Sequence, residues 1–274
     1  MSAGGKHSDL PTRFAAGIVL IAVAVAATYA SGWPFRILGT LAAAVMLLEW
    51  GDMHRVKRAW TWLAILLVSA ILLAGAEFLY PAAASNPELV SSGDLDESWK
   101  GFAAVAAAAL VAGIASRNVA VGWGLLYVGI PAFALIALNW AWAELCLWLF
   151  LVVWSVDIFA YFAGRGIGGP KLAPRISPNK TWAGLIGGMI GAGIVGAVAA
   201  WAMQLDPLFL WLGAPMALLA QMGDLYESSV KRRHGVKDSG TIIPGHGGVL
   251  DRLDGLLPAA VATFAALLVL ARAA

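Results

Sequence analysis

Several apolar runs of roughly 17–22 residues recur along this 274-residue chain, and they constrain its fold more than any other feature. A helix of this length crosses a hydrocarbon core about 30 Å thick. Transmembrane β-strands would instead alternate apolar and polar residues, and these runs do not alternate. Only 12% of the residues are charged, against about 25% in a soluble domain. The sequence therefore predicts an all-α, polytopic transmembrane helical bundle.

About nine spans are predicted from these runs. They cover residues 14–30, 35–50, 60–80, 101–116, 119–138, 142–164, 182–203, 208–226 and 255–271. We interpret the chain as a single membrane domain with four ranges of interest: the whole domain (1–274), the N-terminal helical spans (1–150), a charged region with two loops (151–257) and the last span (255–271).

Two of these spans have particular features. The first resembles a secretory signal because its flank is basic, but Tyr29-Ala30-Ser31 is a poor cleavage site. The span 182–203 contains six glycines, and small residues let helices approach closely. We therefore expect that span to lie inside the bundle. The single cysteine, Cys146, has no disulfide partner in the chain and is expected to be a buried apolar side chain.

The basic residues between the spans are distributed unevenly, which predicts the orientation by the positive-inside rule. With a cytoplasmic N-terminus, all but three of the 18 lysines and arginines fall on the cytoplasmic side; the exceptions are Arg36, Lys100 and Arg272. We therefore expect a multi-pass protein of the cytoplasmic (inner) membrane, with its functional site on the cytoplasmic side.

The first charged loop runs from Gly164 to Gly184 and has basic residues, glycines and prolines but no acid. Glycines let backbone N–H groups approach an anion, and lysine and arginine add positive charge. Ser177 or Asn179 is expected to cap the helix that follows, where an anion is also favoured. The alternative is a basic loop that only sets the topology or contacts anionic lipid.

The second charged loop runs from Ser228 to Asp254 and combines basic, acidic and glycine residues between two apolar spans. Asp251 and Asp254 are three residues apart, so they share one face of a helix. Gly245-His246-Gly247-Gly248 is a turn that brings backbone close to a ligand. His246 is not expected to bind zinc, because no suitably spaced histidine or cysteine accompanies it.

Two further aspartates lie near this loop in the predicted topology. Asp157 lies within a span, where an ionisable residue is costly and usually functional, although it could simply pair with an arginine. Asp224 lies at the inner end of span 208–226. These carboxylates could form salt bridges only, or hold Mg²⁺, which prefers carboxylates together with phosphate oxygens. Other acids near span ends are interpreted as interfacial: Glu49, Asp52, Glu77 and Glu144.

The second loop resembles the signature of the phosphatidate cytidylyltransferase family, also called CDP-diacylglycerol synthases. That signature is S-x-x-K-R-x4-K-D-x-G-x3-P-x-H-G-G-x2-D-R-x-D. Its fixed positions are filled here by Ser228, Lys231, Arg232, Lys237, Asp238, Gly240, Pro244, His246, Gly247, Gly248, Asp251, Arg252 and Asp254. The run Ser177-Pro178-Asn179-Lys180-Thr181-Trp182 also looks like a family element. The family's usual Glu after Thr-Trp is replaced by Ala183, so any role of that Glu is lost or moved.

The resemblance implies a reaction of CTP with phosphatidic acid that gives CDP-diacylglycerol and pyrophosphate, with Mg²⁺ as cofactor. It implies that Asp224 and Asp251 bind the metal, and Asp157 and Asp254 are further candidates. The number of ions stays open, as two divalent ions or one with a monovalent ion. We assign catalytic roles to Asp224, Asp251, Lys237 and Arg252, and substrate binding to Ser177, Asn179, Lys180, Lys231, Arg232, His246, Gly247 and Gly248.

Three rival functions fit the sequence less well. The CDP-alcohol phosphatidyltransferases need D-G-x2-A-R, and the residues after Asp254-Gly255 do not fit that pattern. A transporter would place its charges near mid-membrane and show repeated halves, and an inactive scaffold would not need the complete set of acids. The expected partners are CTP, phosphatidic acid and membrane lipid, with a homodimer as an open alternative and no nucleic acid.

Overall fold

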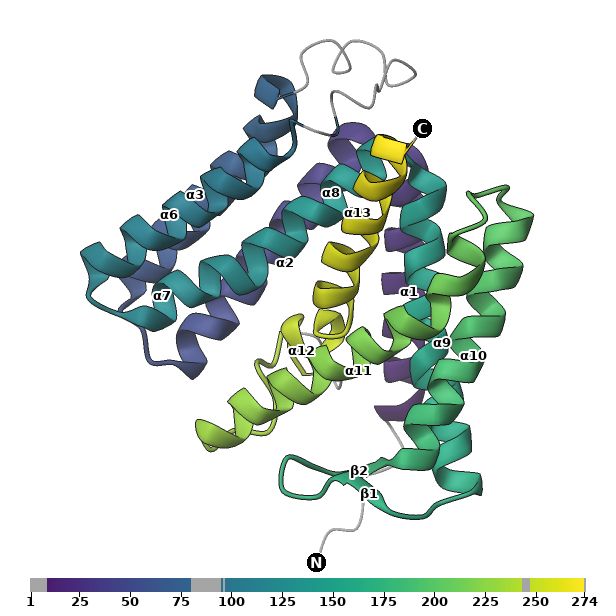
Figure 1. Cartoon of the computed structure of the whole chain (residues 1–274). Coiled ribbons are helices and arrows are strands. Elements are labelled where there is room, and N and C mark those ends of the chain that lie inside the picture. The colour runs from purple at the N-terminus through teal and green to yellow at the C-terminus, as the bar shows by residue number, and fades with distance from the viewer. Residues whose placement is uncertain (1–8, 80–94, 96, 243–246, 274) are drawn as a thin grey trace, which may run out of the picture.

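The computed structural model describes residues 9–79, 95, 97–242 and 247–273 and is mainly helical (Figure 1). Each predicted span coincides with a helical segment. The segments are α1 (Asp9–Ala30), α2 (Gly32–Met53), α3 (Arg58–Leu79), α6 (Trp99–Ser116), α7 (Val119–Gly124), the π-helical turn η2 (Leu125–Gly129), α8 (Ile130–Ala141), α9 (Ala143–Gly166), α10 (Trp182–Ala202), α11 (Phe209–Arg233), the short α12 (Leu250–Leu253) and α13 (Leu256–Ala273). The apolar runs thus predicted the helices well.

Five helical segments of the described chain are long and apolar enough to cross a membrane. They are Gly32–Met53, Trp99–Ser116, Val119–Ala141, Ala143–Gly166 and Trp182–Ala202. The apolar helices Gly17–Ala30, Arg58–Ala74 and Leu256–Arg272 are shorter. This set fits an α-helical, multi-pass membrane protein. Nine crossings and a cytoplasmic N-terminus stay predictions.

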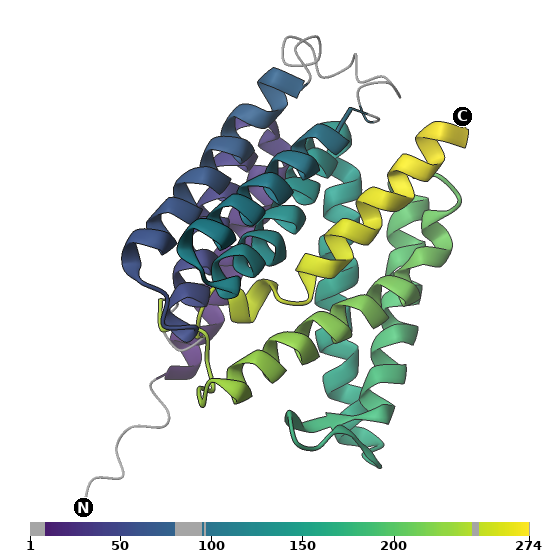
Figure 2. The same ribbon diagram turned by 60° about the vertical axis from the view of Figure 1, so that its left-hand side comes forward.

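Helix α11 is apolar in its first part, but its last ten residues include five charged side chains. The charged end of α11 lies at the same end of the molecule as the loop between α9 and α10 (Figures 1 and 2). Helix α13, which follows the second charged loop, packs against α8, α9 and α11. The helices thereby gather the two charged loops at one end of the bundle.

The glycine-rich helix α10 packs closely on its neighbours but lies at the edge of the bundle, not inside it (Figure 1). Its glycines face α9 and α11, where Nε1 of Trp148 donates to the carbonyl oxygen of Gly196 at 2.8 Å. The opposite face exposes Ile186, Ile190 and Ile194. The expectation of an interior helix was therefore wrong, because the small residues occupy one face and branched apolar residues suited to lipid occupy the other.

The contact between α10 and α11 depends on Gly213. A Cβ atom there would lie 2.3 Å from the carbonyl oxygen of Ala192, a fixed backbone atom. We expect Gly213→Ala to lower the free energy of unfolding by about 1–3 kcal/mol, because the helices must move apart. Gly193→Ala is the control, since its Cβ would meet Ala214 at an ordinary 3.6 Å. Thermal unfolding in detergent compares the two variants with the wild-type chain. Equal unfolding midpoints for Gly213→Ala and Gly193→Ala would contradict the close contact.

A small β-hairpin is the only sheet in the described part of the chain, and it leaves the predicted all-α class unchanged. Strands β1 (Lys171–Ala173) and β2 (Ser177–Thr181) are antiparallel, with Lys171 opposite Thr181 and Ala173 opposite Ser177. Pro174 follows Ala173 in the turn, where the N–H of Ile176 donates to the carbonyl oxygen of Ala173 at 3.1 Å. Proline favours this turn position because its φ is already fixed.

The hairpin also changes how α10 begins. Ser177 and Asn179 are in β2, so neither caps the helix. Thr181 is the N-cap instead, and its Oγ1 accepts a hydrogen bond from the N–H of Gly184 at 3.0 Å. The strand leads directly into the helix, which leaves Thr181 as the last extended residue and the one positioned to cap.

Candidate functional site

One face of α11 carries four polar side chains near its C-terminal end. Asp224, Glu227, Ser228 and Lys231 are three or four residues apart, so they form a row along one side of the helix. Glu227 and Lys231 are buried, whereas Asp224 and Ser228 are half-buried. This row is the frame on which the rest of the site is assembled.

The β-hairpin reaches the row through Lys180. Its Nζ forms an ion pair with Oδ2 of Asp224, and Oγ of Ser228 donates to Oδ1 of the same carboxylate at 3.2 Å. Nearby, Nε of Arg232 donates to the carbonyl oxygen of Ile176 at 3.3 Å. The two charged loops that were predicted to share a site are therefore in contact.

Lys231 lies between two carboxylates. Its Nζ is 2.6 Å from Oε2 of Glu227 and 2.5 Å from Oδ1 of Asp251. Glu227 is 0% exposed and Lys231 is 9% exposed. Since an unpaired buried charge is strongly destabilising, this three-member ion cluster holds α12 against α11.

The second oxygen of Asp251 has three possible donors within hydrogen-bonding distance. The donors to Oδ2 are the N–H of Ser239 at 2.9 Å, Oγ of Ser239 at 3.0 Å and the N–H of Gly248 at 2.8 Å. Burial alone would raise the pKa of Asp251, but the bonds from Lys231, Gly248 and Ser239 outweigh it and hold the pKa below its usual value. The carboxylate is thus ionised and fixed in orientation.

Gly247 is required by this arrangement on two counts. Its φ of +82° is one that side-chain-bearing residues rarely adopt, and a Cβ atom would lie 2.7 Å from Oδ2 of Asp251. Gly247 of the predicted ligand-binding turn therefore makes room for the catalytic candidate Asp251.

Asp254 adds a further carboxylate beside the row. Burial raises its pKa, and the negative charges of Asp224 and Glu227 raise it further. In addition, Oε1 of Glu227 is buried without a hydrogen-bond donor in the described part of the chain. Crowded, incompletely compensated carboxylates of this kind fit a bound cation.

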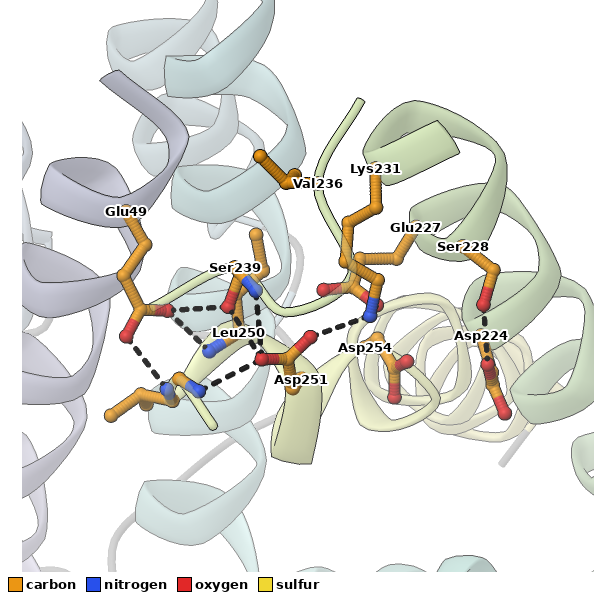
Figure 3. Close-up of polar contacts among 12 residues, drawn as sticks. Glu49, Asp224, Glu227, Ser228, Lys231, Val236, Ser239, Leu250, Asp251 and Asp254 are labelled. Atoms are coloured by element: carbon orange, nitrogen blue, oxygen red, sulfur yellow. Dashed lines mark hydrogen bonds and ion pairs between the residues drawn. The ribbon is translucent and has the colours of Figure 1, made fainter. Parts of the chain in front are cut away.

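A cation would have to compete with the lysines, because Asp224 pairs with Lys180 and Asp251 with Lys231. Figure 3 shows Asp254 between Asp251 and Asp224, so the two predicted metal ligands lie on either side of it. Within the residues that the structure describes, no three Asp, Glu, His or Cys side chains form a ready-made metal site. The fit therefore rests on charge and donor chemistry.

Two further predicted site residues, Asp157 and Arg232, lie around this group of carboxylates. Asp157, on α9, is near enough to Asp224, Lys180 and Arg252 for their charges to interact. Arg232 is exposed, and its Nη1 donates to the carbonyl oxygen of Val236 at 3.3 Å.

Several remaining predicted residues lie at the surface or outside the described chain. Ser177 is half-buried, whereas Asn179, Lys237 and Arg252 have exposed side chains. His246 lies outside the described residues. Ala183 is in the first turn of α10, which carries no acidic residue.

Two buried glutamates were missed as parts of this site. Glu227 immediately precedes the signature, and its helical spacing to Asp224 and Lys231 could have identified it. Glu49 was interpreted as interfacial, but it is 3% exposed and bonds to the signature loop. That interpretation was wrong, because no local pattern reveals a partner about 200 residues away. Asp52 and Glu144 are exposed, and the side chain of Glu77 lies outside the described set.

The fold and the site together define a multi-pass helical membrane protein with a cluster of buried and half-buried carboxylates and lysines at one end of its bundle. Comparison with known families identifies it further. The profile of the cytidylyltransferase family matches residues 11–270, and this chain belongs to that family.

Individual relatives agree with the family. A protein of Brucella abortus biovar 1 (strain 9-941), named phosphatidate cytidylyltransferase, is 36% identical over an alignment of 272 residues, and the alignment covers 92% of this chain and 91% of the relative. A protein of the same name from Rickettsia bellii (strain RML369-C) is 44% identical over an alignment of 149 residues, and the alignment covers 49% of this chain and 63% of the relative.

Proposed function

We propose that this protein is a phosphatidate cytidylyltransferase, which converts CTP and phosphatidic acid into CDP-diacylglycerol and pyrophosphate. The observation that carries the proposal is the pair of lysine–carboxylate contacts on one face of α11. Lys180 comes from the first charged loop and Asp251 from the second, and each meets a partner on that helix. Family membership and the names of the relatives support the same reaction.

The chemistry requires no general base. The second pKa of a phosphomonoester is about 6, so phosphatidic acid is largely a dianion at neutral pH. One of its phosphate oxygens attacks the α-phosphorus of CTP and forms a new P–O bond. The bond between the α-phosphorus and the oxygen that bridges it to the β-phosphorus breaks. The electron pair leaves with pyrophosphate. The main difficulty is the repulsion between two anions, so positive charge and positioning must supply the catalysis.

The chain offers residues for both tasks. Lys180 and Lys231 contact phosphate oxygens when they exchange their carboxylate partners for substrate, and their present ion pairs with Asp224 and Asp251 support this role. Exposed basic residues around this cluster extend the positive charge toward a bound triphosphate: Arg232, Lys237 and Arg252. Ser177, Asn179, His246, Gly247 and Gly248 complete the proposed substrate contacts.

Asp224 and Asp251, with Asp254 and Asp157 beside them, are the residues that would hold Mg²⁺. A divalent ion in that position supplies neutralising charge for the α-phosphate and the leaving pyrophosphate. One or two divalent ions, or one with a monovalent ion, are compatible with this set of carboxylates.

We also propose that the site faces the cytoplasm from the inner membrane. The excess of lysine and arginine in the loops at this end supports that orientation. The exposed branched side chains of α10, such as Ile186 and Ile190, suit contact with lipid tails or with a second copy of the chain. A site at the end of such a bundle lets a lipid headgroup react while its tails stay in the membrane.

The reaction is tested with the purified protein in detergent, phosphatidic acid and CTP labelled in its cytosine. We expect label to enter the lipid fraction and an equal amount of pyrophosphate to be released, both only when Mg²⁺ is present. Diacylglycerol, which lacks the phosphate, is the matched control and should give no labelled product. A transporter would form no labelled lipid, and absence of product and pyrophosphate with every divalent ion tried would reject the proposal.

A further inference from the structure

Glu49, at the C-terminal end of α2, is hydrogen-bonded to the signature loop through both of its carboxylate oxygens. Oε1 accepts from the N–H of Val249 at 2.8 Å, and Oε2 accepts from the N–H of Leu250 at 2.8 Å. Oε2 also accepts from Oγ of Ser239 at 3.0 Å. Glu49 is thus a buried side chain whose oxygens are engaged almost entirely by residues of the second charged loop (Figure 3).

The loop is shaped to receive this carboxylate. A Cβ atom at Gly240 would lie 2.7 Å from Oε1 of Glu49, and one at Gly248 would lie 2.6 Å from the same atom and 2.2 Å from Oγ of Ser239, which bonds to Glu49. Such distances are shorter than any normal contact, so both signature glycines leave the space that Glu49 fills. Neither glycine has a positive φ, so the space is the requirement, not the backbone conformation.

Ser239 connects Glu49 to Asp251. Its Oγ lies 3.0 Å from Oε2 of Glu49 and 3.0 Å from Oδ2 of Asp251. Since a hydroxyl has one proton, it donates to one of these carboxylates at a time. Gly248 also donates its N–H to Asp251. The same short stretch of backbone therefore binds Glu49 and orients Asp251.

We infer that Glu49 is a positioning residue of the active site. It fixes residues 239–240 and 248–250 against the end of α2, and this holds the Asp251 carboxylate in its productive orientation. The inference rests on the proposed function, because Asp251 is the group being positioned. It also gives the N-terminal half of the chain a part in catalysis, through a residue that precedes the signature by about 180 positions.

A carboxylate is needed at this position because it offers two acceptors and no donor. Glutamine would present one oxygen and one NH₂ group, and the NH₂ group would face a backbone or hydroxyl donor. Losing a charge-assisted hydrogen bond in a buried place leaves its partner unpaired. Glu49→Gln therefore releases part of the loop while it keeps the size of the side chain.

The experiment compares Glu49→Gln with the wild-type chain by hydrogen exchange and by the labelled-lipid assay. We expect amide exchange in residues 247–253 to accelerate about tenfold or more, with α9 unchanged. We expect kcat to fall about 10–100-fold, because small displacements of a catalytic group have effects of this size, while KM for phosphatidic acid changes little. Asp52→Asn is the matched control: it lies on the same helix, is exposed and pairs with Arg58, so both readouts should match wild type.

A second variant approaches the same contact from the loop. Gly240→Ala should also lower kcat, because its methyl group collides with Glu49. In a chain that already carries Glu49→Ala, adding Gly240→Ala should lower kcat little further, because the side chain with which the methyl group collides is gone. Unchanged exchange in residues 247–253 of Glu49→Gln would overturn the inference. So would local loosening with normal kcat, which would reveal a purely structural tether, or loosening throughout the protein. A wild-type chain that forms no labelled lipid would instead reject the proposed function itself.

Discussion

Replacing Asp251 with asparagine is expected to reduce the rate of CDP-diacylglycerol formation by about 10²–10³-fold or more, a loss typical of removing an electrostatic catalytic group. Asparagine keeps the size of the side chain but removes its charge. If its amide oxygen accepts from the loop donors, its NH₂ group faces the ammonium group of Lys231, where an acceptor is needed. Both the orientation of the loop donors and the affinity for a cation should suffer.

The folded state should survive this substitution. Lys231 retains its contact with Glu227, so no buried charge is left without a partner. Asp206→Asn is a suitable control, because Asp206 is exposed near the start of α11, at the far end of that helix from the site. Its Oδ1 accepts a hydrogen bond from the N–H of Leu208 at 2.8 Å, which an amide oxygen can also accept. The labelled-lipid assay and thermal unfolding in detergent measure the two effects. Near-normal turnover in Asp251→Asn would reject Asp251 as a metal-binding and catalytic residue.

The helices of this protein could be predicted from the sequence because each depends on a local property. An apolar run must bury or expose its surface to lipid, and it must satisfy its own backbone hydrogen bonds, so its ends follow from composition. The hairpin over residues 171–181 was missed because glycine, proline and basic residues suit a loop as well as a short strand. The position of α10 was missed because glycine content predicts close packing but does not say whether one face or all faces are covered.

The proximity of the candidate residues could be predicted for those in the two charged loops and at the adjoining end of span 208–226. Lys180, Asp224, Lys231 and Asp251 do come together, and the i, i+3 and i+4 rule extends the set to Glu227. Glu49 could not be found in this way, because its bonds to Val249 and Leu250 depend on how α2 packs on α12. Tertiary contacts of this kind are invisible to local periodicity.

The ion cluster of Glu227, Lys231 and Asp251 gives a second prediction of large effect, because it separates folding from catalysis. Lys231→Met keeps the apolar stem of the side chain and removes the ammonium group that both carboxylates contact. Asp251 still has its backbone donors, whereas Glu227 is left buried and unpaired. We expect a loss of about 3–5 kcal/mol in the free energy of unfolding, together with loss of the labelled lipid product.

Two matched variants test the cause of this instability. Adding Glu227→Gln to Lys231→Met neutralises the stranded carboxylate, and it should recover most of the stability without recovering turnover. Lys180→Met removes the other lysine of the site, but Lys180 and Asp224 have side chains that are 20% and 33% exposed. Water can solvate Asp224 when the lysine is absent, so that variant should lose no more than about 1 kcal/mol.

The combination of results decides what Lys231 does. Stability that returns in the double variant while activity stays absent means that Lys231 contacts substrate and also compensates a buried charge. If turnover returns along with stability, Lys231 acts only through the fold, and phosphate binding at this end of the site falls to Lys180 and the exposed arginines. If Lys231→Met unfolds at the wild-type midpoint, Glu227 is not held as a buried anion, and the cluster does not anchor α12 to α11.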